Sequence, residues 1–193
     1  MVRDCFLRRF KFENQLRTDH SFDPTYTPQW MKAASISDIK KELTEKDERE
    51  LQALCLRLAR YKVENKELLS YLLFEADDES GYVSAIKSEV DEMFESLPQG
   101  NVYFIKKALR RILRIVNKHL KYSGIPQTEV EVRLHCCGCI LDKRVPLASS
   151  TVLSNMYKQQ VKKVEAAWAK LPEDLQFDYK RDMDRVKNEK SLK

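Results

Sequence analysis

The stretch VYFIKKALRRILRIVNKHLKY, residues 102–122, decides the fold of this chain. Its large aliphatic side chains recur every three or four residues, which is the spacing of one face of an α-helix. Gly124 and Pro126 follow the stretch, and a glycine and a proline just past a helix end are common stop signals. We therefore expect a long helix that buries one face. The residues on that face are Ile105, Leu109, Ile112 and Val116.

The same helical spacing extends in both directions from this stretch. Thr44 and Asp47 approximate a capping box at the start of one further helix. Residues 64–75 are apolar nearly all round, so we expect a central, buried helix there. Val130–Leu134 alternates like a strand, but five residues are too few to distinguish a strand from a helix. The expected helices span about residues 36–43, 45–61, 64–75, 80–97, 102–122, 128–145, 150–170 and 173–186.

These helices predict an all-α fold made of antiparallel helical hairpins. Short connections favour the pairs 45–75, 80–122 and 128–170, which could form an irregular bundle or a short HEAT-like stack. The 193 residues contain 42% hydrophobic residues, enough for a buried core, and only 4 glycines. We expect a single helical domain over residues 35–187, followed by a frayed tail at 188–193.

The first thirty residues differ from the rest. They are rich in aromatic side chains without a sustained period, and Pro24 and Pro28 oppose a helix in their second half. Residues 1–34 are therefore expected to be a poorly structured extension. Two hypotheses remain open: Met31 is the true start of the protein, or the aromatic segment docks on the domain.

The helix at 102–122 also carries a concentrated positive charge. No Asp or Glu lies between Asn101 and Gln127, and the lysines and arginines fall on the side opposite the aliphatic face. One hypothesis is binding to a phosphate backbone. The other is a solvated helix face compensated by the acidic residues Glu89, Asp91, Glu92 and Glu95. We call the following seven residues the basic face: Lys106, Lys107, Arg110, Arg111, Arg114, Lys118 and Lys121.

Five cysteines are an odd number, and three of them crowd into residues 136–139, which does not suggest a disulfide scaffold. On a helix, Cys137 joins the apolar stripe, whereas His135 and Cys139 point away together. The favoured interpretation is packed core thiols, since cysteine is often buried. We assign no metal site from this pattern. The candidates for metal ligands are His135, Cys136 and Cys139.

Function is constrained mainly by missing motifs. The sequence contains no GxGxxG, GxSxG, HExxH or Glu-x-x-His pattern and no EF-hand loop. We expect a protein-protein interaction module that is not an enzyme, needs no cofactor and binds an unknown protein partner. The alternative is a nucleic-acid-associated protein that uses the basic face, and a third hypothesis is a thiol-dependent or metal-binding protein. Without a long apolar run or a signal segment, we expect a cytoplasmic protein with no membrane association.

Two short motifs carry a resemblance. SDIKKEL at residues 37–43 and LLSYLL at residues 68–73 are similar to segments of small uncharacterised all-helical bacterial proteins of the Bacteroidetes type. The resemblance covers about residues 35–125. It implies a helical fold and a bacterial cytoplasm, and it assigns no site residue.

Overall fold

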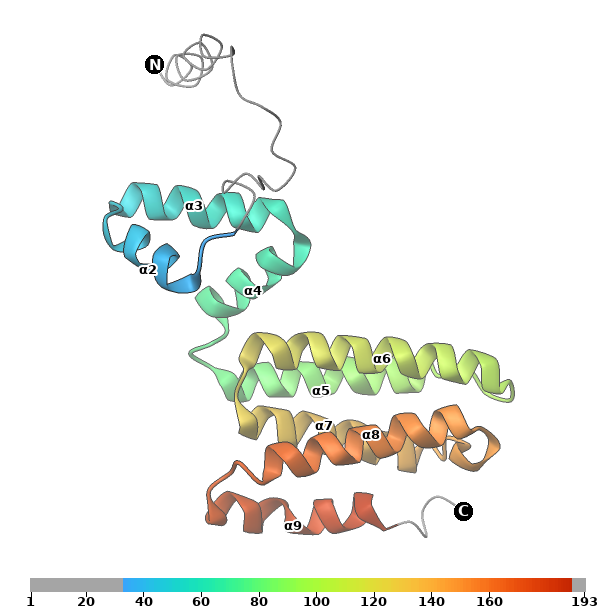
Figure 1. The fold of residues 1–193 in the computed structure, drawn as a ribbon. Helices are drawn as coiled ribbons and strands as arrows, with labels where there is room; N and C mark the ends of the chain where they lie inside the picture. The colour runs from blue at the N-terminus through green and yellow to red at the C-terminus, as the bar shows by residue number, and fades with distance from the viewer. Residues whose placement is uncertain (1–32, 189–193) are drawn as a thin grey trace, which may run out of the picture. The chain divides into compact units, whose positions relative to one another are not determined.

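The structure is a computed structural model that describes residues 33–188 (Figure 1). Within that range all regular structure is helical and no strand occurs, which confirms the all-α prediction. The hypotheses on Met31 and on the aromatic segment lie outside the described residues, as does the tail from residue 189. The helices are α2 (Ile36–Thr44), α3 (Glu48–Tyr61), α4 (Val63–Phe74), α5 (Glu79–Glu95), α6 (Val102–Ser123), α7 (Pro126–Asp142), α8 (Thr151–Trp168) and α9 (Glu173–Lys187), with a 3-10 turn, η2 (Leu147–Ser149).

The chain divides into two compact units after Gln52. The described part of the first unit contains α2 and the start of α3, and no residue of α2 is buried. The second unit contains the remainder of α3 and helices α4 to α9. In the part of the chain that the structure describes, no helix is both long enough and apolar enough to cross a membrane.

Local signals set both ends of α6 and the start of α3. The Asn101 side chain accepts a hydrogen bond from the Tyr103 amide (2.8 Å) at the start of α6. Gly124 ends α6 with φ of 67°, a left-handed conformation that glycine adopts without strain. The predicted capping box of Thr44 and Asp47 is wrong, because the reciprocal pair is Asp47 with Glu50. The Glu50 amide donates to Asp47 Oδ1 (2.7 Å), and the Asp47 amide donates to Glu50 Oε2 (3.3 Å).

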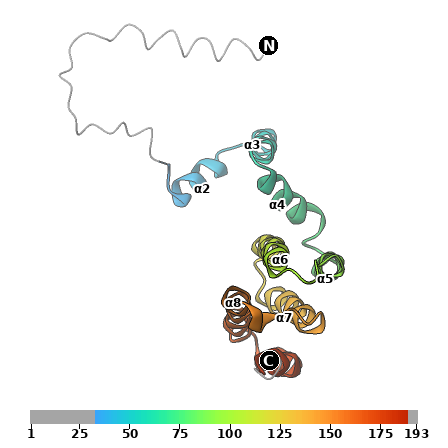
Figure 2. The same cartoon turned by 90° about the vertical axis from the view of Figure 1, so that its right-hand side faces the viewer.

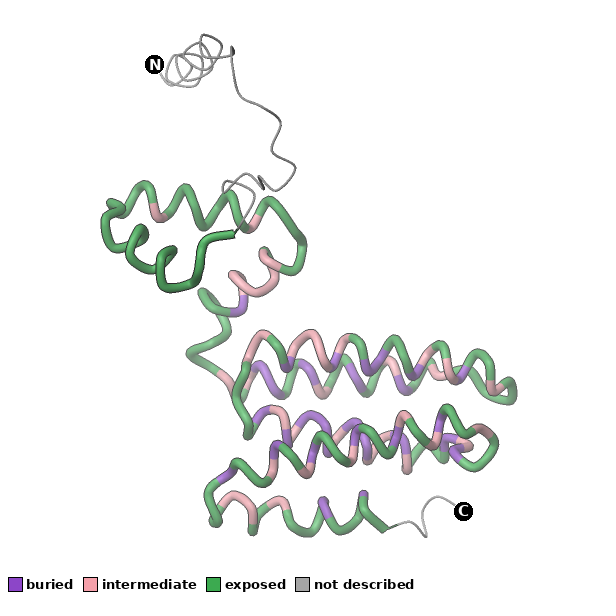
Figure 3. The backbone as a smooth tube through the Cα atoms, in the orientation of Figure 1, coloured by how far each residue is buried: buried purple, intermediate pink, exposed green. Residues whose placement is uncertain are grey.

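The core of the second unit lies between α5, α6, α7, α8 and α9. Figure 2 shows the pairs α5–α6 and α7–α8 end on, with α9 beyond the second pair. Helix α7 packs against all four of the others, so it is the central helix of the bundle. Buried residues concentrate on the facing sides of these helices (Figure 3). The most deeply buried aliphatic side chains include Val90, Leu109, Val116, Val130, Ile140 and Leu153.

Helix α4 is not the buried central helix that its composition predicts. Only Tyr71 of this helix is buried, whereas Leu72, Leu73 and Phe74 are 55%, 61% and 79% exposed. Its contacts run mainly to α6, and Tyr71 also packs against Tyr82 of α5, so only one side of α4 is covered. A helix that is apolar all round gives no periodic signal for which side, or how much of it, will be covered.

One of the carboxylates that join α4 to the bundle is that of Glu79. Glu79, at the start of α5, accepts hydrogen bonds from the hydroxyls of Tyr71 (2.8 Å), Ser123 (2.5 Å) and Thr128 (2.5 Å). Burial opposes the charge, but these three hydrogen bonds outweigh it and lower the pKa of Glu79. Glu79 therefore connects α4, the end of α6 and the start of α7 through one charged group.

Candidate functional site

The basic face lies on the side of α6 that the core does not use. Ile105, Leu109, Ile112 and Val116 are all buried, as predicted. Five residues of the basic face are exposed, and the remaining two, Lys106 and Lys118, are partly buried. The five exposed residues are Lys107, Arg110, Arg111, Arg114 and Lys121.

Three of the four acidic residues of α5 that could compensate the basic face pair with groups outside it. Glu89 pairs with His119 (Oε2–Nε2 3.3 Å), Asp91 with His135 (Oδ1–Nε2 2.7 Å) and Glu95 with Lys143 (Oε1–Nζ 2.6 Å). These three carboxylates therefore have partners outside the basic face, which contradicts the compensation hypothesis for them. The fourth acid, Glu92, lines a hollow together with Lys107, Arg111 and Arg114 but forms no ion pair with a described residue.

Only one residue of the basic face has an acidic partner among residues 33–188. Lys118 Nζ lies 3.0 Å from Glu67 Oε2, and the Tyr122 hydroxyl donates to the same carboxylate (2.7 Å). The other six cations form no ion pair with any described residue. The acid-free helix α6 thus presents five exposed cations that form no ion pair with any described residue.

A hollow adjoins the basic face between α5 and α6. Its volume is about 610 Å³, and Lys107, Arg111 and Arg114 contribute to its lining together with Phe104. The Phe104 side chain is 51% exposed, and its ring packs edge-on against Tyr103 with a centroid distance of 5.4 Å. Glu92 is the acidic residue among those that line the hollow. Aromatic and cationic groups are therefore accessible at the same place.

The cysteine cluster divides between the core and the surface. Cys136 is 1% exposed and Cys137 is fully buried, which confirms that these two are packed core thiols. Burial raises the pKa of Cys136 well above its ordinary value and raises that of Cys137 to about 12, so both thiols are protonated at neutral pH. Of the three candidate metal ligands, only His135 and Cys139 therefore lie together, and Cys136 is buried in the core.

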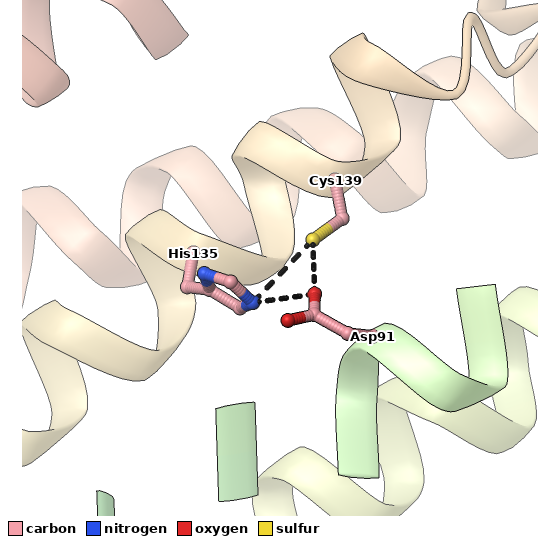
Figure 4. A group of neighbouring side chains, drawn as sticks. All are labelled: Asp91, His135 and Cys139. Carbon is pink, nitrogen blue, oxygen red and sulfur yellow. Dashed lines mark hydrogen bonds and ion pairs between the residues drawn. The ribbon is translucent and has the colours of Figure 1, made fainter. Parts of the chain in front are cut away.

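His135 and Cys139 point to the same side of α7, as their spacing predicts, and they meet Asp91 of α5 (Figure 4). The Cys139 sulfur lies 3.6 Å from His135 Nε2 and 3.3 Å from Asp91 Oδ1. Burial, and then the hydrogen bond to Asp91, raise the pKa of Cys139 to about 12. Sequence reasoning missed Asp91 in this role, because only the packing of α5 against α7 brings it to this position.

No protein-family model, curated protein or solved structure matches this chain. Its candidate sites therefore rest on the geometry alone.

Proposed function

We propose that the protein binds the phosphate backbone of nucleic acid through the basic face of α6. The observation that carries this proposal is the absence of an acidic partner, among residues 33–188, for six of the seven cations. Each phosphate contact of a lysine or arginine releases condensed counterions, which makes binding favourable and strongly dependent on salt. Arginine is well suited to this role, because its planar guanidinium contacts phosphate through two hydrogen bonds.

The exposed aromatic rings favour single-stranded nucleic acid within this proposal. Phe104 shares its hollow with Lys107, Arg111 and Arg114. Proteins that bind single strands combine a positively charged groove with aromatic side chains on which bases stack, worth about 1–3 kcal/mol per base. A duplex keeps its bases stacked on one another, so Phe104 would contribute less to duplex binding.

Charge reversal at Arg110, Arg111 and Arg114 tests the proposal. All three are exposed and have no ion pair with a described residue, so their replacement by Glu leaves the core intact. We expect the triple variant to bind a single-stranded oligonucleotide at least about tenfold more weakly in low salt. The slope of log K against log salt should also decrease by about 2 to 3. Fluorescence anisotropy across a salt series measures both quantities.

A matched control is available on α8, where Lys158, Lys162 and Lys163 are also exposed. Replacing these three lysines by Glu changes the net charge by the same amount but leaves the basic face unchanged. Equal loss of binding in both triple variants would show that only net charge matters and would contradict a local site. Binding of polyglutamate without binding of the oligonucleotide would reassign the basic face to an acidic protein partner.

A second candidate function is the protein-protein interaction module that the sequence favours. The supporting observation is a shallow apolar hollow of about 370 Å³ whose lining includes Leu56, Leu69, Leu73 and Phe74. Exposed aliphatic and aromatic side chains of this kind fit the apolar face of a partner helix.

Two substitutions in this hollow test the second candidate. Leu73 and Phe74 are 61% and 79% exposed, so replacing both by Glu should leave the free energy of unfolding within about 0.5 kcal/mol of the parent. We expect a specific partner that the parent retains after nuclease treatment to bind this double variant at least tenfold more weakly. Equal retention by parent and variant would exclude this hollow as the interface.

A further inference from the structure

Three side chains of different chemistry aim one atom each at a common point between α5 and α7 (Figure 4). The atoms are Asp91 Oδ1, His135 Nε2 and Cys139 Sγ, and all three lie within 4.8 Å of one another. His135 and Cys139 are one helical turn apart, a spacing that places two ligands on the same side of a helix. Asp91 reaches the same point from the neighbouring helix.

Two of the three distances between these atoms are close to those around a tetrahedral metal ion. Zinc lies about 2.3 Å from a thiolate sulfur, about 2.0–2.1 Å from a histidine nitrogen and about 2.0–2.2 Å from a carboxylate oxygen. Tetrahedral angles then place the sulfur about 3.6 Å from the nitrogen and about 3.5 Å from the oxygen, and the nitrogen about 3.3 Å from the oxygen. The corresponding distances here are 3.6, 3.3 and 2.7 Å. Only Asp91 has to move appreciably, and its side chain is 53% exposed.

The same arrangement opposes a catalytic triad. In such a triad the histidine contacts the nucleophile through one ring nitrogen and the orienting carboxylate through the other. Here Cys139 and Asp91 both contact Nε2 of His135. One ring nitrogen cannot exchange a proton with the Cys139 thiol while the Asp91 carboxylate holds the ring through that same nitrogen. Three ligand atoms that converge on one point are instead the geometry of metal chelation.

A cavity leaves room for a fourth ligand. His135 and Cys139 line a cavity of about 260 Å³, and Tyr179 and Asp182 of α9 contribute to its wall. The nearby cations are already paired, Lys87 with Glu131 and Arg185 with Asp142. Among the described residues no further His, Cys, Asp or Glu joins this cluster, so water is the simplest occupant of the fourth position.

We propose that Asp91, His135 and Cys139 bind one Zn²⁺ ion per chain, with water as the fourth ligand. Thiolate, imidazole and carboxylate together match the ligand preferences of zinc, and an open fourth position is the pattern of zinc sites that bind or activate a small molecule. Binding replaces the Cys139 thiol proton by the metal and releases that proton to solvent.

Cobalt provides the test, because Co²⁺ occupies tetrahedral zinc sites and gives visible bands together with a thiolate charge-transfer absorption. We expect the metal-free full chain to bind one Co²⁺ with these bands, and Zn²⁺ to displace it. Cys139→Ser should abolish the charge-transfer absorption, and Asp91→Ala should weaken Zn²⁺ binding at least tenfold. Asp91 is exposed, so this second variant remains informative even if Cys139→Ser folds poorly.

Cys55→Ser is the matched control, because Cys55 is an exposed cysteine outside the cluster. It should bind both metals as the parent does. Loss of the charge-transfer absorption in this control, or unchanged Zn²⁺ binding in the Asp91→Ala variant, would overturn the proposal. Absence of tetrahedral cobalt bands in the parent would also overturn it and leave the cluster as a hydrogen-bonded trio.

Discussion

Replacing Phe94 with alanine should lower the free energy of unfolding by about 3–5 kcal/mol. Phe94 lies near the end of α5 and is only 1% exposed within the core shared by α5, α6 and α7. Removing its ring loses the free energy of transferring the benzyl group from water and leaves a cavity that the packed helices fill only in part. This loss is a large share of the roughly 5–15 kcal/mol that stabilises a typical domain.

Urea denaturation followed by circular dichroism measures the Phe94→Ala effect. The control is Phe177→Ala, because Phe177 on α9 is 78% exposed and the same atoms are removed without creating a cavity. We expect the control to change the free energy of unfolding by no more than about 0.5 kcal/mol. A Phe94→Ala effect below 1 kcal/mol would contradict the position of α5 in the core.

Helix positions and most core faces follow from the sequence, because they depend on local spacing. The burial of Leu109 and Val116 is implied by their places on one face of a 3.6-residue period. The start of α6 at Asn101 and its end at Gly124 likewise follow from capping chemistry between residues a few positions apart. Such signals do not depend on which helices pack together.

Partner choice between helices could not be predicted in the same way. One hypothesis from the sequence places the acidic face of α5 beside the basic face, yet Asp91 and Glu95 pair with His135 and Lys143 on α7 and just beyond its end. Which neighbour a helix face meets depends on packing over the whole bundle, and an exposed ion pair contributes too little, about 0–1 kcal/mol, to decide that packing. For the same reason, the metal-ligand role proposed for Asp91 could not be predicted from the sequence.

The exposure of α4 shows a related limit. Leucine and phenylalanine at successive positions predict burial, but burial requires another surface to cover them. Among the described residues, α5 and α6 cover the side that includes Tyr71, whose ring packs against Tyr82 of α5, and Leu73 and Phe74 remain exposed. Composition alone cannot distinguish a core helix from a helix whose apolar side chains remain exposed and can contact a partner.

Arg133 is the charged residue that sequence reasoning did not place in the core. It is only 5% exposed, and it lies between the buried residues Val132 and Leu134 of α7. Its Nε donates to Glu129 one turn earlier (2.8 Å), and its Nη1 donates to Gln160 of α8 (2.7 Å). Gln160 is itself 5% exposed, so this hydrogen bond lies within the α7–α8 interface. A buried guanidinium is tolerated only because these acceptors are in place.

Gln160→Leu should therefore destabilise the protein by about 2–4 kcal/mol, although it adds an apolar side chain to a buried position. Leucine cannot accept a hydrogen bond, so Nη1 of Arg133 would lose its partner where water cannot replace it. Gln159→Leu is the control, because Gln159 is the exposed neighbour on the same helix. It should shift the free energy of unfolding by no more than about 0.5 kcal/mol.

The double variant Arg133→Met/Gln160→Leu should recover most of the stability lost in Gln160→Leu. It removes the buried charge and its acceptor together, and apolar replacement of a buried polar pair is often neutral or stabilising. Glu129, which loses its partner in this variant, has a side chain 32% exposed and can be solvated instead. A double-mutant cycle in urea measures the coupling between positions 133 and 160. Additive losses, with no recovery in the double variant, would show that the two positions act through packing alone and not through this hydrogen bond.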